Sequence, residues 1–315
     1  MLVPFIALLG SQGFPISYAD ATEHWNVSAP RGAHSFDYGT YPLVSGDYFR
    51  NVPVANCHSH NDYWRDVPLF TGLSHGCYST EADVWLFNGT LLVGHDVASL
   101  RSERTFSSLY IDPLVAILDQ KNPVNQYVSF AEQLGHVEKN GVFDTNSAQT
   151  LQLLVDVKTD GEQTWPYVVA ALEPLRTRGY LSFVNQNDTE PNSRAVTVIG
   201  TGNTPLEYLL ARPERDYFFD APLAALNSTF TPSLSPLAST SLQTAVNWLG
   251  IFPATATQLD ILETYITQAH AQGLKTRIWD NPSWPRFARD RVWLTFLDLG
   301  VDLLNADDLQ AVTSL

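Results

Sequence analysis

The chain contains 315 residues, of which 44% are hydrophobic and 16% are charged. This composition supplies enough apolar side chains for a large core and too little charge for an intrinsically disordered chain. The 33 acidic residues outnumber the 18 basic ones and give a formal net charge of −15. An acidic surface repels nucleic acids and anionic membranes at long range, so we expect neither as a partner. A phosphate-bearing ligand is compatible with this charge, because a bound cation can reverse the field inside a pocket.

The first 19 residues are mostly apolar and end in Ser17-Tyr18-Ala19, a small-x-small pattern that suits signal peptidase. No basic residue precedes the apolar stretch, and its glycines and prolines make it a poor membrane-spanning helix. We expect a signal peptide over residues 1–19, a secreted or secretory-pathway glycoprotein and no integral membrane span in the mature chain. The alternative is a soluble intracellular protein with an ordinary N-terminal extension. The glycosylation sequons begin at Asn26, Asn88, Asn187 and Asn227.

Residues 20–50 are rich in Gly, Pro, Ser and Tyr and predict an irregular lead-in. From residue 51 to residue 315, short apolar β-rich runs alternate with helical stretches, the pattern of a parallel sheet with crossover helices. We expect a single domain over 51–315, an α/β fold of the (β/α)₈ or TIM-barrel type, which takes about 250 residues or more. The predicted strands are, in chain order, Val52–His58, Tyr78–Val84, Leu91–His95, Leu151–Val157, Val196–Ile199, Tyr217–Asp220, Lys275–Trp279 and Asp302–Asn305.

Three helices are predicted between these strands. Gln258–Gln272 carries apolar residues at helical spacing, and both it and Arg289–Leu299 are followed by a glycine that can cap the helix. A third helix is expected to start near Thr164, with Pro166 in its first turn. Leu237–Leu242 is an additional strand candidate, which leaves the strand count near the sixth strand open.

The two cysteines, Cys57 and Cys77, could form one bridge in an oxidising compartment. Cys57 neighbours the inward-facing His58 and is therefore expected to face outward. Cys77 shares parity with Glu81 and Asp83 and is expected to face inward. Side chains that point to opposite sides of neighbouring strands do not bridge easily, so we expect two buried free thiols.

Three carboxylates lie near the C-terminal ends of predicted strands, where barrel enzymes keep their active sites. Glu81 and Asp83 belong to the run STEADVW, and Asp156 belongs to LLVDVKTD. Residues two apart on a strand share a face, so Glu81 and Asp83 both point into the barrel. Three inward carboxylates repel one another strongly unless a cation lies among them. Oxygen ligands favour one divalent Mg²⁺, or else Ca²⁺, over zinc.

Histidines occupy the ends of two predicted strands. His58 and His60 lie in CHSHNDYW, and His95 lies in LLVGHD. A pair of histidines on opposite sides of a phosphate can serve as acid and base, while Lys158, two residues after Asp156, adds a positive charge nearby. Each of these residues is common by itself, but their order on successive strand ends favours catalysis.

That order resembles the phospholipase C-like phosphodiesterase superfamily, which includes glycerophosphodiester phosphodiesterases and the spider-venom sphingomyelinase D toxins. Within it, the chain is most similar to the fungal altered inheritance of mitochondria protein 6 family. The segments that carry this resemblance are HSHNDYWR, GCYSTEADVWLFNGTLLVGHD, LYIDPL and GVDLLNADDL. The similarity spans residues 53 to 309, nearly the whole barrel.

The resemblance implies a metal-dependent phosphodiesterase that acts on a lipid head group or a glycerophosphodiester. It implies one set of metal ligands, Glu81, Asp83 and Asp156, and an acid–base pair, His58 and His95. If the attacking hydroxyl is water the enzyme is a hydrolase, and if it belongs to the substrate a cyclic phosphate forms and the enzyme is a lyase.

The resemblance implies substrate contacts by Lys158 and Trp279, and we expect His60 and Asn61 to contact the substrate as well. Glycerophosphodiester enzymes usually have an arginine directly after the first histidine, where this chain has Ser59. His60, Asn61 or Arg65 could replace that arginine.

Two other interpretations are open. The motif His58-Ser59-His60 also suits an amidohydrolase-like metal-dependent hydrolase, although such enzymes need further histidines on the middle strands. A barrel that binds a phosphate-bearing ligand without catalysis is the other alternative.

Overall fold

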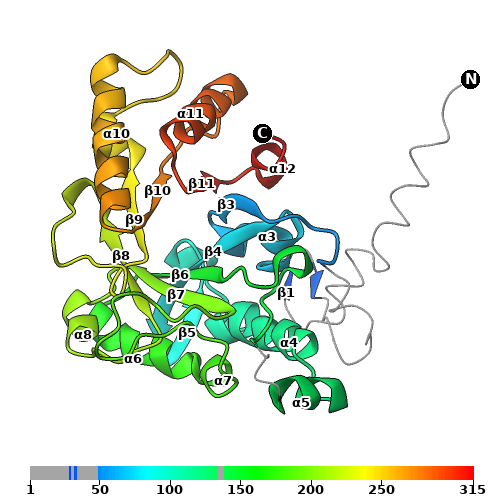
Figure 1. The fold of residues 1–315 in the computed structure, drawn as a ribbon. Coiled ribbons are helices and arrows are strands. Elements are labelled where there is room, and N and C mark those ends of the chain that lie inside the picture. Colours follow the sequence, from blue (N-terminus) through cyan, green and yellow to red (C-terminus); the bar gives the residue numbers. More distant parts are fainter. Residues whose placement is uncertain (1–27, 30–31, 34–48, 134–137) are drawn as a thin grey trace, which may run out of the picture.

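A computed structural model describes residues 28–29, 32–33, 49–133 and 138–315 (Figure 1). The expected signal peptide over 1–19, the sequon at Asn26 and most of the expected lead-in over 20–50 lie outside the described residues. Two short strands of that lead-in, β1 (Ser28–Ala29) and β2 (Gly32–Ala33), pair in antiparallel fashion. In the described part of the chain, no helix combines the length and apolar character that crossing a membrane requires.

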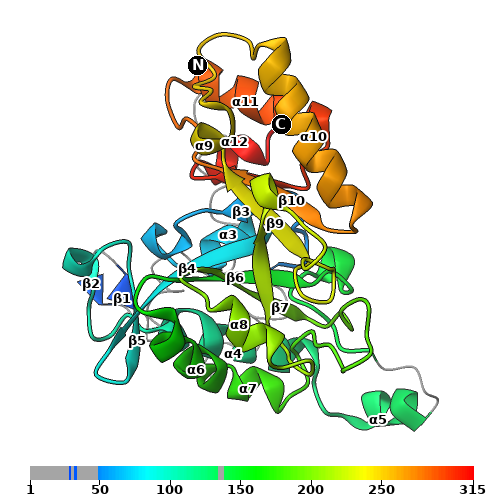
Figure 2. The ribbon, with the colours of Figure 1, turned by 90° about the vertical axis from the view of Figure 1, so that its left-hand side faces the viewer.

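Eight parallel strands close into a barrel. Figure 2 shows several of these strands, among them β4, β6 and β7, in the middle of the molecule. The eight strands pair in the order β3-β11-β10-β9-β8-β7-β6-β4, and β3 also pairs with β4, so the sheet has no open side. This closure confirms the predicted (β/α)₈ fold. The barrel strands are β3 (Ala55–Ser59), β4 (Cys77–Phe87), β6 (Leu151–Val157), β7 (Val196–Gly202), β8 (Phe218–Pro222), β9 (Leu237–Ser241), β10 (Lys275–Trp279) and β11 (Leu303–Ala306).

The third predicted strand is not part of the barrel. It corresponds to β5 (Thr90–Val93), which pairs antiparallel with β4 and forms a hairpin at its end. The turn consists of Asn88 and Gly89, both with positive φ, which matches the tight turn that Asn-Gly favours. A two-residue connection permits only antiparallel pairing, so the prediction of a barrel strand at Leu91–His95 was wrong. The additional candidate near Leu237 is β9, which completes the eight.

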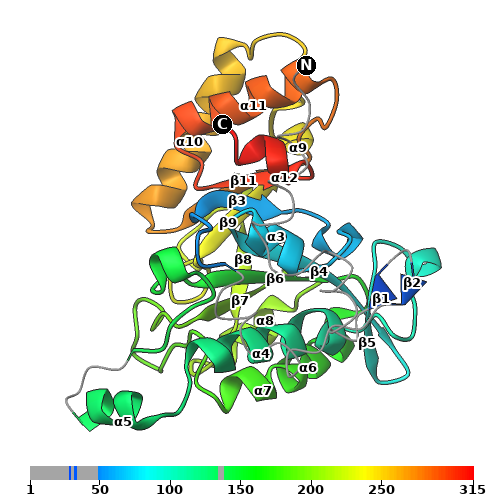
Figure 3. The same cartoon turned by 90° about the vertical axis from the view of Figure 1, so that its right-hand side faces the viewer.

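Helices cover the outside of the barrel (Figures 1 and 3), with α10 to α12 on one side and α4, α6 and α7 on the other. Two predicted helices are confirmed with slightly earlier starts, as α10 and α11. Pro166 lies inside α6 rather than in its first turn, because Asp160 caps that helix and it begins at Gly161. The helices are α3 (Phe70–Ser74), α4 (Asp112–Lys121), α5 (Gln126–Gln133), α6 (Gly161–Ala171), α7 (Glu173–Arg176), α8 (Leu206–Leu210), α9 (Leu242–Val246), α10 (Ala256–Ala271), α11 (Arg286–Leu299) and α12 (Leu309–Val312), with short helical turns η2 (Asp62–Trp64), η3 (Val97–Ser99), η4 (Ser107–Ile111), η5 (Asp144–Asn146) and η6 (Leu223–Ala225).

Cys57 and Cys77 form a disulfide between β3 and β4, with 4.7 Å between their Cα atoms. The prediction of two free thiols was therefore wrong. It assumed that side chains alternate in step on the two strands, but the register between β3 and β4 shifts by one residue between Ala55 and His58. An extra residue in one strand breaks the alternation, so parity no longer separates the two sulfur atoms.

Candidate active site

The three predicted carboxylates meet at the C-terminal end of the barrel. Asp83 on β4 and Asp156 on β6 are paired across the two strands, and Glu81 precedes Asp83 on the same face. One carboxylate oxygen from each lies within 4.8 Å of the other two. Among the described residues this is the one group of three side chains that could hold a metal ion together.

Gly202 on β7 leaves space for this cluster. A Cβ atom at this position would lie 2.1 Å from Asp156 Oδ1, and its φ of +63° also favours glycine. The close approach of bare backbone to the Asp156 carboxylate is the kind of contact that requires a residue without a side chain. Gly202 therefore allows Asp156 to turn toward Glu81 and Asp83.

Two basic side chains compensate the carboxylates in part. Lys158 Nζ lies 2.9 Å from Asp83 Oδ2 and 2.9 Å from Asp156 Oδ2, and Arg277 Nη2 lies 3.4 Å from Glu81 Oε1. Burial and the negative charge of Glu81 nevertheless raise the pKa of Asp83 to about 7. Three carboxylates against two cations leave an excess of negative charge, and all the candidate ligand atoms are oxygens. These features fit a hard divalent cation such as Mg²⁺ or Ca²⁺.

His58 is completely buried beside Glu81. Its Nδ1 lies 2.7 Å from Ser79 Oγ, and its Nε2 lies 3.8 Å from Glu81 Oε1. Burial, together with the charge of Arg277, lowers the pKa of His58 to about 3, so the ring is neutral at pH 7. Nε2 has no hydrogen-bond partner among the described residues, and this buried nitrogen points at the carboxylate cluster. His58 thus presents an unpaired nitrogen toward Glu81, with no other described side chain hydrogen-bonded to it.

His60 and Asn61 contact the same carboxylate from the loop after β3. His60 Nε2 lies 3.8 Å from Glu81 Oε2, and the backbone N–H of Asn61 donates to that oxygen at 3.0 Å. Burial alone would lower the pKa of His60, but a hydrogen bond with Asp307 and the charge of Glu81 raise it. Both histidines of the His-x-His motif therefore face Glu81, while the candidate metal site of three carboxylates itself contains no histidine.

His95 approaches the cluster from the side of Asp83. It follows β5, and the β4–β5 hairpin brings it back toward the strand that carries the carboxylates. Its Nδ1 lies 3.1 Å from the Tyr63 hydroxyl and 4.0 Å from Asp83 Oδ2, and its ring packs against Trp64 at a centroid distance of 4.6 Å. Half of the His95 side chain is exposed. The two predicted catalytic histidines thus approach different carboxylates. His58 is buried beside Glu81, and His95 lies beside Asp83 with half of its side chain open to solvent.

Sequence reasoning missed Arg277, Asp307 and the role of Tyr63. The Tyr63 hydroxyl donates to Asp83 Oδ2 at 2.8 Å and also lies 2.5 Å from Asn61 Oδ1, so it connects the loop after β3 to a candidate metal ligand. Arg277 could have been found, because it lies two residues before the end of β10 and shares parity with the inward face. Asp307 lies just beyond β11, and no local pattern distinguishes it.

Two other residues singled out in the sequence, Arg65 and Trp279, make their contacts away from the three carboxylates. Arg65, a candidate to replace the missing arginine, donates to the backbone carbonyls of His60 at 3.1 Å and Ala306 at 3.0 Å and to that of Asp307. Its guanidinium therefore joins the ends of β3 and β11. Trp279 ends β10 and is 40% exposed.

Comparisons with known proteins place this chain among sequence relatives. The model of the AIM6-like phosphodiesterase domain matches residues 46–220. The altered inheritance of mitochondria protein 6 homolog of Arthroderma benhamiae is 45% identical over 268 residues, covering 84% of this chain and 80% of that protein. The Saccharomyces cerevisiae protein of the same name is 37% identical over 289 residues, covering 84% and 72%.

A solved glycerophosphodiester phosphodiesterase from Parabacteroides distasonis aligns with 84% of this chain and 97% of its own, at 13% identity and a TM-score of 0.43. The family assignment depends instead on the matched domain and on the sequence relatives. The chain belongs to the family of AIM6-like phosphodiesterase domains.

Proposed function

We propose that the protein is a metal-dependent phosphodiesterase in which His58 and His95 act as the acid–base pair. One observation carries the proposal: Glu81, Asp83 and Asp156 converge between these two histidines at the C-terminal end of the barrel. That arrangement supports both a cation site and proton transfer at a phosphate.

A divalent cation, Mg²⁺ or else Ca²⁺, held by Glu81, Asp83 and Asp156 would stabilise negative charge on the phosphate. One histidine removes a proton from the attacking hydroxyl, and the other protonates the leaving oxygen. Lys158, between Asp83 and Asp156, adds positive charge for the phosphate oxygens. The attacking hydroxyl belongs to water in a hydrolase and to the substrate in a lyase that releases a cyclic phosphate.

We also propose a substrate of the lipid head-group or glycerophosphodiester type, with His60, Asn61 and Trp279 contacting it. A secretory-pathway location stays part of this proposal. The described sequon asparagines, Asn88, Asn187 and Asn227, are all exposed, which supports access for glycosylation.

The experiment is a phosphodiester panel assayed with chelator and after return of Mg²⁺, Ca²⁺ or Zn²⁺, with products analysed for cyclic phosphate. We expect His58→Ala and His95→Ala each to lower kcat about 10²- to 10⁴-fold, the usual contribution of a general acid or base. His270→Ala is the matched control for His95→Ala, because the two side chains are similarly exposed but His270, near the end of α10, pairs with Asp302 instead of the cluster. Near-normal activity of either active-site variant would contradict these roles, and stoichiometric bound zinc would favour the amidohydrolase-like alternative.

A further inference from the structure

The hydroxyl of Tyr63 lies where the loop after β3 meets the carboxylate cluster. Three polar atoms surround its oxygen: Asn61 Oδ1 at 2.5 Å, Asp83 Oδ2 at 2.8 Å and His95 Nδ1 at 3.1 Å. The side chain of Tyr63 is buried, so these contacts form with little competition from water. One phenol oxygen therefore joins the loop after β3, the strand β4 and the residue that follows the β4–β5 hairpin.

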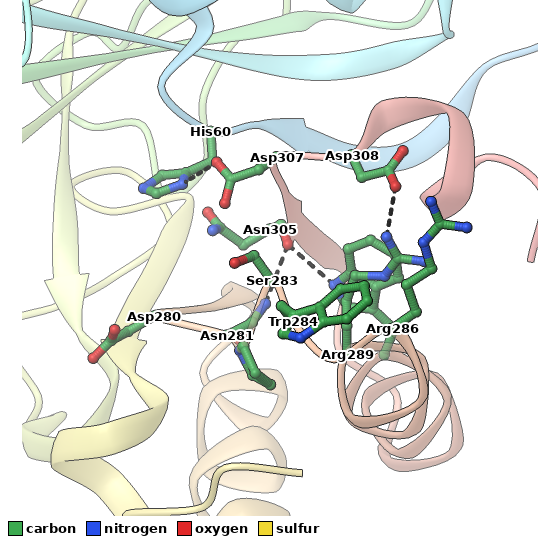
Figure 4. A pocket seen from close by; sticks show the side chains of 12 residues that line it. His60, Asp280, Asn281, Ser283, Trp284, Arg286, Arg289, Asn305, Asp307 and Asp308 are labelled. Carbon is green, nitrogen blue, oxygen red and sulfur yellow. Dashed lines mark hydrogen bonds and ion pairs between the residues drawn. The ribbon is translucent and has the colours of Figure 1, made fainter. Parts of the chain in front are cut away.

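The turn that carries Tyr63 is anchored on both sides. The neighbouring Asp62 is completely buried and accepts the backbone N–H of Leu69 at 2.5 Å. Earlier in the same loop, His60 Nδ1 lies 2.9 Å from Asp307 Oδ1, at the edge of the cavity drawn in Figure 4. A buried turn held by several contacts keeps one geometry, so the Tyr63 hydroxyl is fixed in place.

The contacts of this hydroxyl determine which atom donates in each. A phenol hydroxyl has one proton to donate and lone pairs that accept. Asp83 Oδ2 also lies 2.9 Å from Lys158 Nζ, a donor, so this oxygen accepts, and the amide oxygen of Asn61 can only accept. The phenol proton is taken by one of these two oxygens. The contact with His95 is then a hydrogen bond only if His95 Nδ1 carries a proton and donates it to the phenol oxygen.

The same hydroxyl orients Asp83. Oδ2 accepts from Tyr63 and lies against Lys158, so two donors meet one carboxylate oxygen. No described residue donates a hydrogen bond to the other oxygen, Oδ1. The two donors therefore fix the carboxylate so that Oδ1 is the oxygen available to a cation. Partners that orient a ligand in this way typically change metal affinity or activity about 10- to 100-fold.

We propose that Tyr63 is a positioning residue for the active site: its hydroxyl fixes Asp83 by donating to Oδ2 and fixes His95 by accepting from Nδ1. In the neutral ring of His95 this leaves the lone pair on Nε2. Nε2 is then the nitrogen that takes and returns a proton during the reaction, while Nδ1 keeps its own. The inference rests on the proposed phosphodiesterase function, in which His95 belongs to the acid–base pair.

A change that removes only the hydroxyl separates positioning from packing. Tyr63→Phe keeps the ring and its burial. Tyr180→Phe is the matched control, because Tyr180 is equally buried and its hydroxyl also donates to a carboxylate, Asp119 Oδ1 on α4, at 2.9 Å. Both variants lose one bond of the same kind, so a difference between them reports where the hydroxyl lies.

Nitrogen-15 NMR of the histidine rings tests the contact with His95, at a pH where this ring is neutral. We expect the proton of His95 on Nδ1 in the wild type and in Tyr180→Phe, and a shift of that proton toward Nε2 in Tyr63→Phe. His95→Gln identifies the resonances by their loss. A wild-type proton on Nε2, or an unchanged proton position in Tyr63→Phe, would overturn the proposal.

Calorimetric titration with Mg²⁺ tests the contact with Asp83. The Kd for Mg²⁺ should rise about tenfold or more in Tyr63→Phe and stay at the wild-type value in Tyr180→Phe. At saturating Mg²⁺, kcat of Tyr63→Phe should still fall about tenfold with KM little changed, because His95 has lost its orientation. Equal Mg²⁺ affinity in the wild type and Tyr63→Phe would contradict the assignment.

The spectroscopic and binding measurements separate this inference from the catalytic one. If the proton position and the Mg²⁺ affinity change as expected in a protein that cleaves no phosphodiester, Tyr63 holds both residues and the proposed function is wrong. If diesters are cleaved but neither quantity changes in Tyr63→Phe, the positioning role is wrong and the proposed function holds.

Discussion

The two sides of the barrel mouth differ in how they hold their polar groups. On the β4–β6 side, Glu81 and Asp83 are buried on strands and lie against basic side chains. On the β10–β11 side, Asn281 and Trp284 lie in a loop, with an acceptor unpaired and an indole exposed. Strands hold side chains rigidly, while loops tolerate variation, and the chemistry proposed above lies on the first side.

The largest expected effect comes from removing a carboxylate on the β4–β6 side of the barrel mouth. Asp83→Asn should lower kcat/KM about 10³-fold or more, because it removes one candidate ligand from a site where the proposed cation would contribute several kcal/mol of charge stabilisation. Calorimetry with Mg²⁺ should show weaker binding in parallel. Asp119→Asn, an exposed carboxylate paired with Arg178, is the control and should bind and turn over normally. Undiminished metal binding by Asp83→Asn would mean that the cation lies elsewhere.

A smaller effect is expected on stability when the Cys57–Cys77 disulfide between β3 and β4 is removed. The double variant Cys57→Ala, Cys77→Ala should lose about 3 kcal/mol of the free energy of unfolding, because the bridge closes a loop between residues 20 apart in the sequence. Urea titration of the oxidised wild type and the double variant measures the difference. Equal stabilities would show that pairing between β3 and β4 is sufficient to hold this side.

The smallest expected effect concerns a buried acid deeper in the barrel. Burial raises the pKa of Asp220 to about 6, although Arg277 at 4.0 Å lowers it. The folded protein therefore binds this proton more tightly than the unfolded chain, whose Asp pKa is about 3.9, and the free energy of unfolding falls as pH rises from about 4 to about 6. Asp220→Asn should remove this fall, a difference of about 2 kcal/mol between pH 4 and pH 8.

Unfolding experiments at the two pH values, with the exposed Asp260→Asn as control, measure this difference. Parallel pH profiles for wild type and Asp220→Asn would show that the barrel interior solvates this carboxylate well. The free-energy cost of holding an ionised carboxylate inside the barrel would then be smaller than the burial of Asp220 indicates, and the barrel interior would differ less from the loop side.

Patterns that are local along a strand were predicted correctly. The bounds of β6 and β10 agree with the sequence, and alternation within β4 placed Glu81 and Asp83 on one face. The expectation that Glu81, Asp83 and Asp156 lie together followed from this alternation and from the position of Asp156 on the neighbouring strand β6. This success depends on periodicity of two, which needs no knowledge of the partner strand.

Features that depend on pairing between segments were predicted less well. The register shift between β3 and β4 reversed the expectation for Cys57 and Cys77. The hairpin turn at Asn88-Gly89 carried a recognisable signal, yet the strand that follows it was assigned to the barrel. Arg277 reaches Glu81 across 196 positions of sequence, and only closure of the sheet brings them together.

Closure of the barrel by its first and last strands also affects how the protein is made. All three carboxylates have been synthesised once residue 156 is added, but β3 cannot pair with β11 until Leu303–Ala306 leaves the ribosome. Arg65 and His60 likewise gain their contacts with Asp307 only then. A nascent chain arrested before β11 therefore carries the three carboxylates with one edge of β3 exposed, which makes it prone to association, and it lacks the contact between His60 and Asp307.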